Sequence, residues 1–333
     1  MLRRLVKKIG SFLVLPALLV TAVANWFVHQ PRHWQQAHAQ RVPPMLADFG
    51  FRLGNASADV TDALGLTGRD ATAPLATPFP TNLLICAGHP GRTGNEVPND
   101  IVVLNKQGFT IGYSPSLRHP VWVAYKTHPV HRAELPPRPT SFKPDPAARN
   151  SPQHKDYTKS GYDRGHMAPN LAIVSRHGKD AQIQTFLTSN ICPQRPSLNQ
   201  GPWRDLEFRI SELWPDRYGE VWVIVGAVTS PTPTRLPSGV NIPTAFYQIV
   251  VAQEQGRVRA FAVYMPQAIR RREYARTTLV SIDEIERITG LDFLANLPDD
   301  AEAALEAAVP TRLWPTGPKG LYKLLREQFR KYD

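Results

Sequence analysis

The sequence predicts an α+β fold in which strands outnumber helices. Short apolar or alternating segments, separated by turn residues, recur from Pro80 onward, and this pattern is typical of β-strands. One stretch between them, residues 198–214, instead repeats its apolar residues about every 3.6 positions, the period of an amphipathic helix. With 333 residues, 42% of them hydrophobic and 20% charged, the chain is long enough to bury a core and has a globular composition.

Seven segments are predicted to form strands. Lys106-Gln107-Gly108 separates the second from the third and predicts a hairpin. In chain order the seven are residues 82–86, 101–105, 109–113, 120–125, 221–225, 245–251 and 259–264. The 32 prolines, about twice the average usage, predict many loops, and we expect a long one at residues 128–150.

Two helices are predicted among these strands. The first covers residues 198–214, and its core-facing stripe consists of Leu198, Trp203, Leu206, Ile210 and Leu213. The second covers residues 281–288. It begins at Ser281 and is stopped by Gly290, which are favourable residues for a helix start and end.

The chain divides into four predicted parts. They are a signal peptide or signal anchor (residues 1–30), a linker or N-terminal extension (31–78), the main domain (79–298) and a C-terminal helical extension (299–333). The linker has weak periodicity. The extension carries Ala/Glu-rich and Lys/Arg-rich patches of helical character, and we expect it to be an appendage to the main domain.

The N-terminus predicts export. Four basic residues precede an apolar run at 9–28, and no acidic residue occurs before Asp48. The run is long enough to span a bilayer, while Ala22-Val23-Ala24 offers a small-residue cleavage site. Both outcomes stay open. Either one places the bulk of the chain outside the cytoplasm, in the periplasm, in the medium or anchored to the membrane. A mitochondrial location or a buried N-terminal helix is less favoured.

The net charge and the cysteine content say less about the function of the protein than the N-terminus says about its location. A net charge of +11 and a pI near 9.8 suit a polyanionic partner, either nucleic acid or an anionic membrane surface. Cys86 and Cys192 could pair in an oxidising compartment or pack as free thiols. Cys86 and His89 lack the second pair that a zinc site needs.

Asp163-Arg164-Gly165-His166 is a candidate phosphate-chemistry motif. Histidine is the natural proton acceptor near neutral pH, and an arginine stabilises a negatively charged phosphorane. On an extended segment Arg164 and His166 would point to the same side, since the side-chain period is two. Asp163 would then anchor the loop or orient a neighbour, and Gly165 would provide a bend. Alone, the string also fits a polar surface loop.

Asn190, Asn199 and Glu207 follow downstream. Asparagine offers a neutral oxygen that suits Mg²⁺. Asn199 is expected at or near the start of the first helix, with Glu207 two turns on and within about 80° of it around the helix. The alternative is that both asparagines cap helices or close turns.

Together these segments resemble the DNA/RNA non-specific endonuclease family, which includes endonuclease G and secreted bacterial nucleases. The resemblance is carried by SGYDRGHMAPN, SNICPQ and LNQGPWRDLE, with RHPVWVAY, VIVGAV, IPTAFYQIVV and ITGLDF in the family's order. It extends from about Pro80 to Pro298. It implies the ββα-metal, or His-Me finger, fold: a hairpin bearing the histidine, a helix bearing the metal ligand, and a mostly antiparallel central sheet flanked by helices.

The resemblance also implies an activity and residue roles. The family cuts DNA and RNA without sequence or sugar preference, uses Mg²⁺ with Mn²⁺ as a substitute, leaves 5′-phosphate ends and often forms homodimers. By resemblance His166 is the general base and Asn199 the sole direct protein ligand of Mg²⁺. Arg164 stabilises the phosphorane, while Asn190 and Glu207 hold the metal's waters, and Glu207 also counts among the catalytic residues.

Two positions depart from the family pattern. Ser211 stands where the secreted bacterial branch has an arginine, and Arg204 or Arg209 could replace that arginine in substrate binding. Gln248 stands where many relatives have lysine. The arginines at 270–272 and the basic residues at 326–331 could also follow phosphates.

Two other functions stay open. One is a nucleic-acid-binding protein of the same fold with weakened catalysis. The other is a phosphodiesterase for small or lipid-linked phosphates near a membrane. The presence of His166, Arg164 and Asn199 together favours the nuclease.

Overall fold

The computed structural model describes residues 68–75, 79, 84–94, 97–130, 134–271, 278–317, 320 and 323. All of them belong to one compact unit, Asp62–Asp333. The predicted signal segment and most of the predicted linker lie outside the described residues. Within the described part, no helix has both the length and the apolar character needed to cross a membrane.

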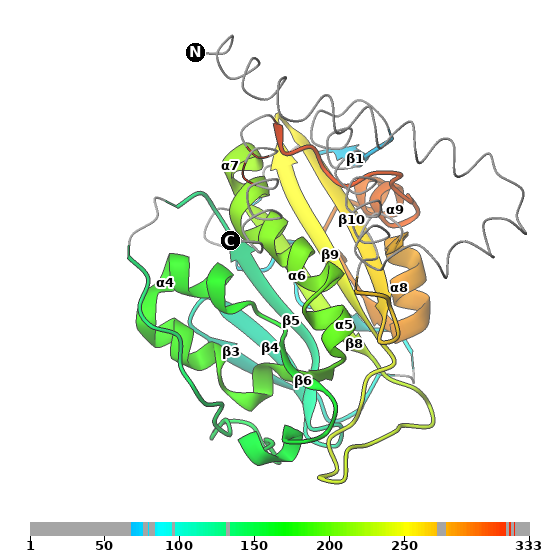
Figure 1. Cartoon of the computed structure of the whole chain (residues 1–333). Helices are drawn as coiled ribbons and strands as arrows, with labels where there is room; N and C mark the ends of the chain where they lie inside the picture. The colour runs from blue at the N-terminus through cyan, green and yellow to red at the C-terminus, as the bar shows by residue number, and fades with distance from the viewer. Residues whose placement is uncertain are drawn as a thin grey trace, which may run out of the picture. The chain divides into compact units, whose positions relative to one another are not determined.

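An antiparallel sheet forms the centre of the molecule, with the strand order β1-β10-β9-β8-β5-β4-β3 and β11 beside β10 (Figure 1). The strands are β1 (Ala71–Pro74), β3 (Val102–Lys106), β4 (Phe109–Ser114), β5 (His119–Thr127), β8 (Val221–Val228), β9 (Ala245–Glu254), β10 (Arg257–Pro266) and β11 (Leu279–Val280). The predicted α+β fold with an antiparallel sheet is therefore confirmed.

Six of the seven predicted strands are confirmed, as is the β3–β4 hairpin, whose turn places Gly108 at φ 87°. The prediction for residues 82–86 is wrong at its described residues, 84–86, which lie in a bend and a turn. Ala87 and Gly88 follow with φ of 55° and 90°, and this left-handed backbone is incompatible with a continuing strand.

Hydrophobic cores cover both faces of the sheet. In β8, Val221, Val223 and Val225 join one core and Trp222 and Ile224 join the other, as the strand period of two requires. The first core packs under α4 (Asn170–Thr185), α5 (Pro196–Asn199), α6 (Pro202–Phe208) and α7 (Trp214–Tyr218). The second packs under α8 (Ile282–Thr289) and α9 (Asp299–Glu306). The minor strands are β2 (Gly91–Arg92), paired with β12 (Leu291–Asp292), and β6 (Asp163–His166), paired with β7 (Ile191–Gln194).

The helix predicted at residues 198–214 is divided into α5, α6, a π-helical turn (Arg209–Leu213) and the start of α7. The break between α5 and α6 falls at Gly201, where a Cβ would lie 2.4 Å from the Ser197 carbonyl oxygen and 2.5 Å from that of Arg271. The expectation that Asn199 starts the helix, two straight turns before Glu207, is therefore wrong. Asn199 instead ends α5.

The second predicted helix is confirmed as α8. Ser281 Oγ accepts from the backbone N–H of Glu284 at 3.1 Å, and Gly290 ends the helix at φ 66°. Helix α4 was not predicted, and Gly178 interrupts it with φ 78°, which weakens its sequence periodicity.

Elements on both sides of the predicted main domain pack against it. Strand β1 lies within the predicted linker but pairs with β10 in the sheet. Helix α9 confirms helical structure at the start of the C-terminal extension, yet its Leu305 is 1% exposed, and Trp314 is 0% exposed. Trp314 packs edge-on against Phe261 and Trp214 at 5.0 and 5.5 Å. Residues 299–314 thus complete the core and are not an appendage, while the basic residues at 326–331 lie outside the described residues.

Candidate active site

A two-stranded antiparallel ribbon, β6 with β7, carries the Asp-Arg-Gly-His motif. The register pairs His166 with Ile191 and Asp163 with Gln194. Helix α4 and a 3-10 turn (Thr188–Asn190) connect the two strands, and α5 follows β7 directly and packs on β6. The expected extended backbone is therefore present, and the ribbon brings two motifs that are distant in sequence side by side.

Asp163 orients the amide of Asn199. Its Oδ2 accepts a hydrogen bond from Asn199 Nδ2 at 2.8 Å and another from Gln200 Nε2 at 2.8 Å. Within the described residues, Asn199 Oδ1 makes no hydrogen bond, and a neutral carbonyl oxygen suits Mg²⁺. The residues present therefore fit a magnesium ion held through one protein oxygen, and Asp163 has the contacts expected of an orienting residue.

His166 is buried in an aromatic pocket. Its ring lies 5.3 Å from Phe142 and 4.9 Å from Phe186, edge-on to the latter, and the residue is 9% exposed. Nε2 has no hydrogen-bond partner within the described chain. Burial and, to a smaller extent, the positive charge of Arg138 lower the pKa of His166 to about 3. The imidazole is thus neutral at physiological pH, which is the form that a general base needs, but so low a pKa makes it a weak base until a negative charge such as a substrate phosphate lies nearby.

Arg164 is held beside this pocket. Its Nη2 donates to the His154 carbonyl oxygen at 2.8 Å and to Thr158 Oγ1 at 2.9 Å. The guanidinium also lies 5.9 Å from the ring centres of Phe142 and Tyr157. These contacts fix the orientation of the charge before any substrate binds.

Gly165 makes room for Gln194. A Cβ at this position would lie 2.0 Å from Gln194 Oε1 and 2.3 Å from its Cδ. The glycine belongs to an extended strand, so the expected bend is wrong, and close approach of the partner strand's side chain is the reason for glycine here.

The side chain of Asn190 hydrogen-bonds to backbone groups. Its Oδ1 accepts from the N–H of Ala168 at 2.8 Å, and its Nδ2 donates to the carbonyls of Ala168 and Thr185 at 3.0 Å each. The side chain is 0% exposed. These contacts favour the alternative that Asn190 closes the turn behind His166, over the prediction that it holds metal waters.

Glu207 and His166 share a charged neighbour, Arg138. Burial raises the pKa of Glu207 to about 8, while Trp203, Arg138 and Arg204 offset part of the rise. Arg138 lies 5.3 Å from the ring centre of Phe186, next to the histidine pocket. Sequence reasoning missed Arg138, because the proline-rich loop at 128–150 offered no motif around it.

The tentative substrate-binding arginines have different surroundings. Arg204 is exposed, as a phosphate contact requires, whereas Arg209 is 2% exposed and so is not presented to a substrate. Ser211 and Gln248, at 3% and 1% exposure, are also buried. A basic residue at either position would therefore lie in the interior and not on the surface.

A further arginine reaches the site from a distant loop. Arg271 is exposed, and its Nη2 donates to Gln200 Oε1 at 3.2 Å, one residue from Asn199. Arg270 is also exposed, and Arg272 lies outside the described residues. Part of the predicted 270–272 cluster thus lies beside Asn199, the predicted metal ligand.

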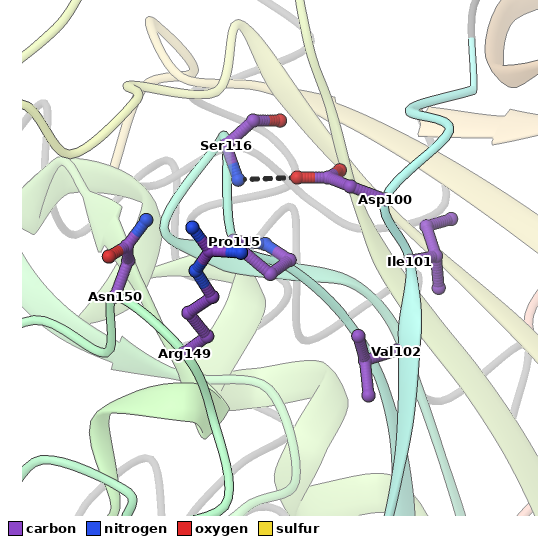
Figure 2. A pocket seen from close by; sticks show the side chains of 7 residues that line it. All are labelled: Asp100, Ile101, Val102, Pro115, Ser116, Arg149 and Asn150. Carbon is purple, nitrogen blue, oxygen red and sulfur yellow. Dashed lines mark hydrogen bonds between the residues drawn. The ribbon is translucent and has the colours of Figure 1, made fainter.

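A surface hollow elsewhere does not include the predicted site residues (Figure 2). It is lined by Asp100, Ile101, Val102, Pro115, Ser116, Arg149 and Asn150. Asp100 Oδ1 accepts from Ser114 Oγ at 2.7 Å and Oδ2 accepts from the Ser116 N–H at 2.6 Å. Since its carboxylate serves to hold a turn, this hollow is not a second candidate for catalysis.

Cys86 and Cys192 are free thiols. They belong to different cores, on opposite faces of the sheet, so the disulfide alternative is excluded in this structure. Burial raises the pKa of both thiols, which makes them unreactive.

Comparison with known proteins identifies the fold and the family. The chain matches the family model for DNA/RNA non-specific endonuclease over residues 88–300. A nuclease of Nostoc sp. is 30% identical over 237 residues, covering 67% of this chain and 84% of that protein. Endonuclease G of Homo sapiens is 29% identical over 209 residues, covering 58% and 69%. The Serratia marcescens nuclease is 29% identical over 221 residues, covering 62% and 80%.

The crystal structure of the EndoG/EndoGI complex superposes with a TM-score of 0.57 at 24% identity, covering 68% of this chain and 96% of that one. This likeness supports the fold. Because the family model covers more than half of the chain, including the β6–β7 ribbon and α5, the protein belongs to the DNA/RNA non-specific endonuclease family and is a nucleic-acid hydrolase.

Proposed function

We propose that this protein is a magnesium-dependent endonuclease that hydrolyses DNA and RNA without preference for sequence or sugar. The observation that carries the proposal is a neutral, buried His166 on a ribbon whose Asp163 orients the amide of Asn199. The net charge of +11 suits a polyanionic substrate. Mn²⁺ is expected to substitute for Mg²⁺, and a homodimer stays a prediction.

His166 acts as the base in this proposal. Its Nε2, which has no partner within the described chain, accepts the proton that a water loses as it attacks phosphorus. Phe142 and Phe186 hold the ring and exclude bulk water from it. Since the 3′ oxygen departs, the products carry 5′-phosphate and 3′-hydroxyl ends.

Arg164 and Arg138 provide positive charge around the reacting phosphate. Arg164 is fixed by His154 and Thr158, so stabilising the phosphorane would need little reorganisation. Asn199 would hold the magnesium ion. Asp163 would orient the Asn199 amide, and Glu207 would bind the ion's waters. When bound, Mg²⁺ offsets the charge that develops on the phosphate and the leaving oxygen.

The purified full chain can be tested on supercoiled plasmid and on RNA, each with Mg²⁺ or with EDTA. Both substrates are expected to be cut only with Mg²⁺, and the products to carry a phosphatase-sensitive 5′ end. His166→Ala should reduce the rate by about 10²–10⁴-fold. His89→Ala is a matched control, because His89 is exposed and packs on Trp122, in the opposite core.

Each outcome decides between the alternatives. Full activity in His166→Ala would overturn the mechanism. Retarded migration without cleavage would favour a nucleic-acid-binding protein with weakened catalysis, and cleavage of only one nucleic acid would overturn the lack of sugar preference.

We also propose that residues 1–30 export the protein or anchor it, with the nuclease domain outside the cytoplasm. The support is the basic segment followed by the apolar run at 9–28. Fractionation of expressing cells tests this. Full-length protein in the membrane fraction indicates an anchor, a shortened protein in the periplasm or medium indicates cleavage, and a cytoplasmic location contradicts the proposal.

A further inference from the structure

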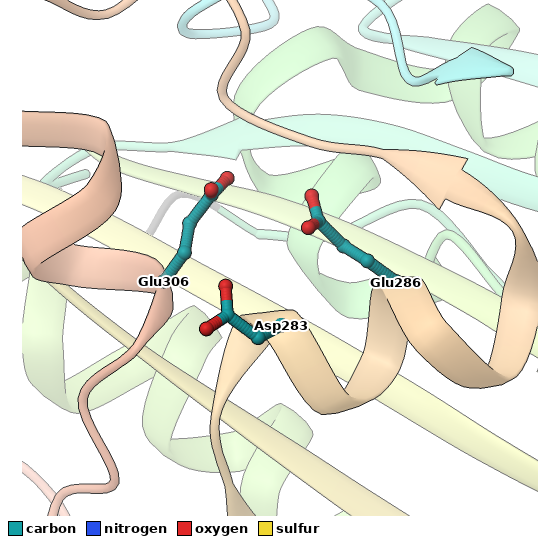
Figure 3. A group of neighbouring side chains, drawn as sticks. All are labelled: Asp283, Glu286 and Glu306. Atoms are coloured by element: carbon teal, nitrogen blue, oxygen red, sulfur yellow. The ribbon is translucent and has the colours of Figure 1, made fainter. Parts of the chain in front are cut away.

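Three carboxylates from two helices converge on the face of the sheet opposite the active site. Asp283 and Glu286 lie on α8, and Glu306 is the last residue of α9. One oxygen from each lies within 4.8 Å of the other two. Figure 3 shows the three carboxyl groups turned toward one another. We refer to these three residues as the acidic cluster.

Glu306 is buried and lacks a partner for one oxygen. The residue is 7% exposed, and its Oε1 has no hydrogen bond within the described chain. A buried carboxylate without a partner is costly, so it must take up a proton or meet a cation. Its place at the end of α9 adds to the cost, because the C-terminal end of a helix carries partial negative charge.

The surroundings of Glu306 are negative. Burial, with the charges of its acidic neighbours, raises the pKa of Glu306 to about 8, and these neighbours are Glu286, Glu302, Asp283 and Asp292. The pKa values of Glu286 and Glu302 are raised too, mainly by burial. No lysine or arginine of the described residues forms an ion pair with the acidic cluster. Carboxylates that hinder one another's ionisation in this way are relieved by a divalent cation.

We propose that the acidic cluster binds one divalent cation, with Ca²⁺ the best match, and that this ion ties α8 to α9. Ca²⁺ accepts several carboxylate ligands in a flexible geometry, whereas Mg²⁺ demands a near-ideal octahedron and usually keeps several of its waters. Three carboxylates leave room for the waters that complete a calcium shell. The site is chemically distinct from the single neutral oxygen of Asn199 and does not depend on the proposed nuclease mechanism.

The test uses the full chain with Asn199→Ala, which removes the magnesium ligand of the active site. Equilibrium dialysis is expected to retain one Ca²⁺ per chain. Thermal unfolding should occur about 5 °C or more higher in CaCl2 than in EGTA. Adding Glu306→Gln should abolish both the retained calcium and the shift. Adding Glu284→Gln should leave both unchanged, since Glu284 lies on the same helix but is paired with Arg287 at 2.7 Å.

The Glu306→Gln variant also distinguishes a loss of calcium binding from a loss of folding. Because a glutamine amide has nearly the shape of the protonated carboxyl group and carries no charge, Glu306→Gln is expected to unfold in EGTA at a temperature no lower than its parent. A chain that retains no Ca²⁺ would overturn the proposal and assign Glu306 a proton instead. Calcium binding that persists in Glu306→Gln would also overturn it.

Discussion

Each face of the central sheet buries an ionisable side chain that has an atom without a hydrogen-bond partner in the described chain. The neighbouring charge is positive on one face and negative on the other. On one face His166 Nε2 lies beside Arg138. On the other face Glu306 Oε1 lies among carboxylates. Burial disfavours the charged form of both groups. In each case the neighbouring charge acts in the same direction as burial, which keeps the histidine unprotonated and the carboxyl protonated.

The two groups differ in the species that each can bind. A neutral imidazole near guanidinium groups can take a proton from water while those groups stabilise an anion. A crowded carboxyl can only be relieved by a proton or a metal cation. The same physical cause, burial beside charge that further disfavours the ionised form, thus acts on the base that we propose on one face and on the cation site that we propose on the other. Four changes test the catalytic side of this comparison.

Removing the amide of Asn199 is expected to have the largest effect. Asn199→Ala deletes the oxygen that would hold the metal, which we expect to contribute several kcal/mol of transition-state stabilisation, so kcat/KM for plasmid cleavage in Mg²⁺ should fall about 10³-fold. Gln200→Ala is the matched control, because Gln200 donates to the same Asp163 oxygen but is not a proposed ligand. Loss of less than about threefold in Asn199→Ala would contradict the metal assignment.

The depressed pKa of His166 predicts a stability effect with a definite sign. The folded pKa is about 3 against an ordinary value of 6.5, so below pH 6.5 the unfolded chain binds a proton that the folded chain excludes. Stability is therefore complete above pH 6.5 and is lost as the pH falls toward 3, by up to about 1.4 kcal/mol per pH unit. This amounts to about 2.3 kcal/mol between pH 6.5 and 4.5.

His166→Asn removes this titration, so its free energy of unfolding should fall less than that of the parent over the same range. Urea unfolding at pH 4.5, 5.5 and 6.5 measures the difference. His119, also buried with a lowered pKa, is retained in both chains and cancels. Parallel curves for the two chains would show that the histidine is not buried in the neutral form.

Asp163→Asn should weaken the orientation of Asn199 without removing the ligand. Loss of such supporting hydrogen bonds to a metal ligand costs about 10–100-fold. The Mg²⁺ concentration for half-maximal activity should rise, and added Mg²⁺ should restore part of the rate, which a purely structural defect would not allow. Asp180→Asn, at an exposed position on α4, is the control. A reduced rate with an unchanged Mg²⁺ requirement would argue against an orienting role.

Much of the fold was predictable because its signals are local. The strands of the sheet alternate or are continuously apolar, and α8 carries its start and stop in Ser281 and Gly290. The break at Gly201 was missed because the apolar period runs through it, although Pro202 at the first position of α6 has no N–H with which to continue a helix; the close approach of the distant Arg271 carbonyl to Gly201 could not be foreseen. The burial of Trp314 depends likewise on a core that only the complete fold creates.

The site was predictable to a similar extent. The motifs that contain Asp163, His166 and Asn199 could be recognised in the sequence, while the roles expected of these residues came from the resemblance to the family; the structure places Asp163 and His166 on β6 and joins Asp163 to Asn199 of α5. The commitment of Asn190 to the backbone could not be seen, because an asparagine serves equally well in a turn and near a metal. Arg138 was missed since a loop arginine acquires its place only when the loop folds over the histidine pocket.

Arg138→Ala is expected to have the smallest effect. Arg138 is exposed and has a charge effect on His166 and Glu207, so its removal should weaken substrate binding more than the chemical step. We expect KM to rise about threefold to fivefold and the salt dependence of binding to lessen by about one phosphate contact. Arg149→Ala, at the hollow in Figure 2, is the matched exposed arginine. Equal effects of the two substitutions would mean that Arg138 contributes only to net charge, whereas a larger effect at Arg138 would indicate that it contacts the substrate.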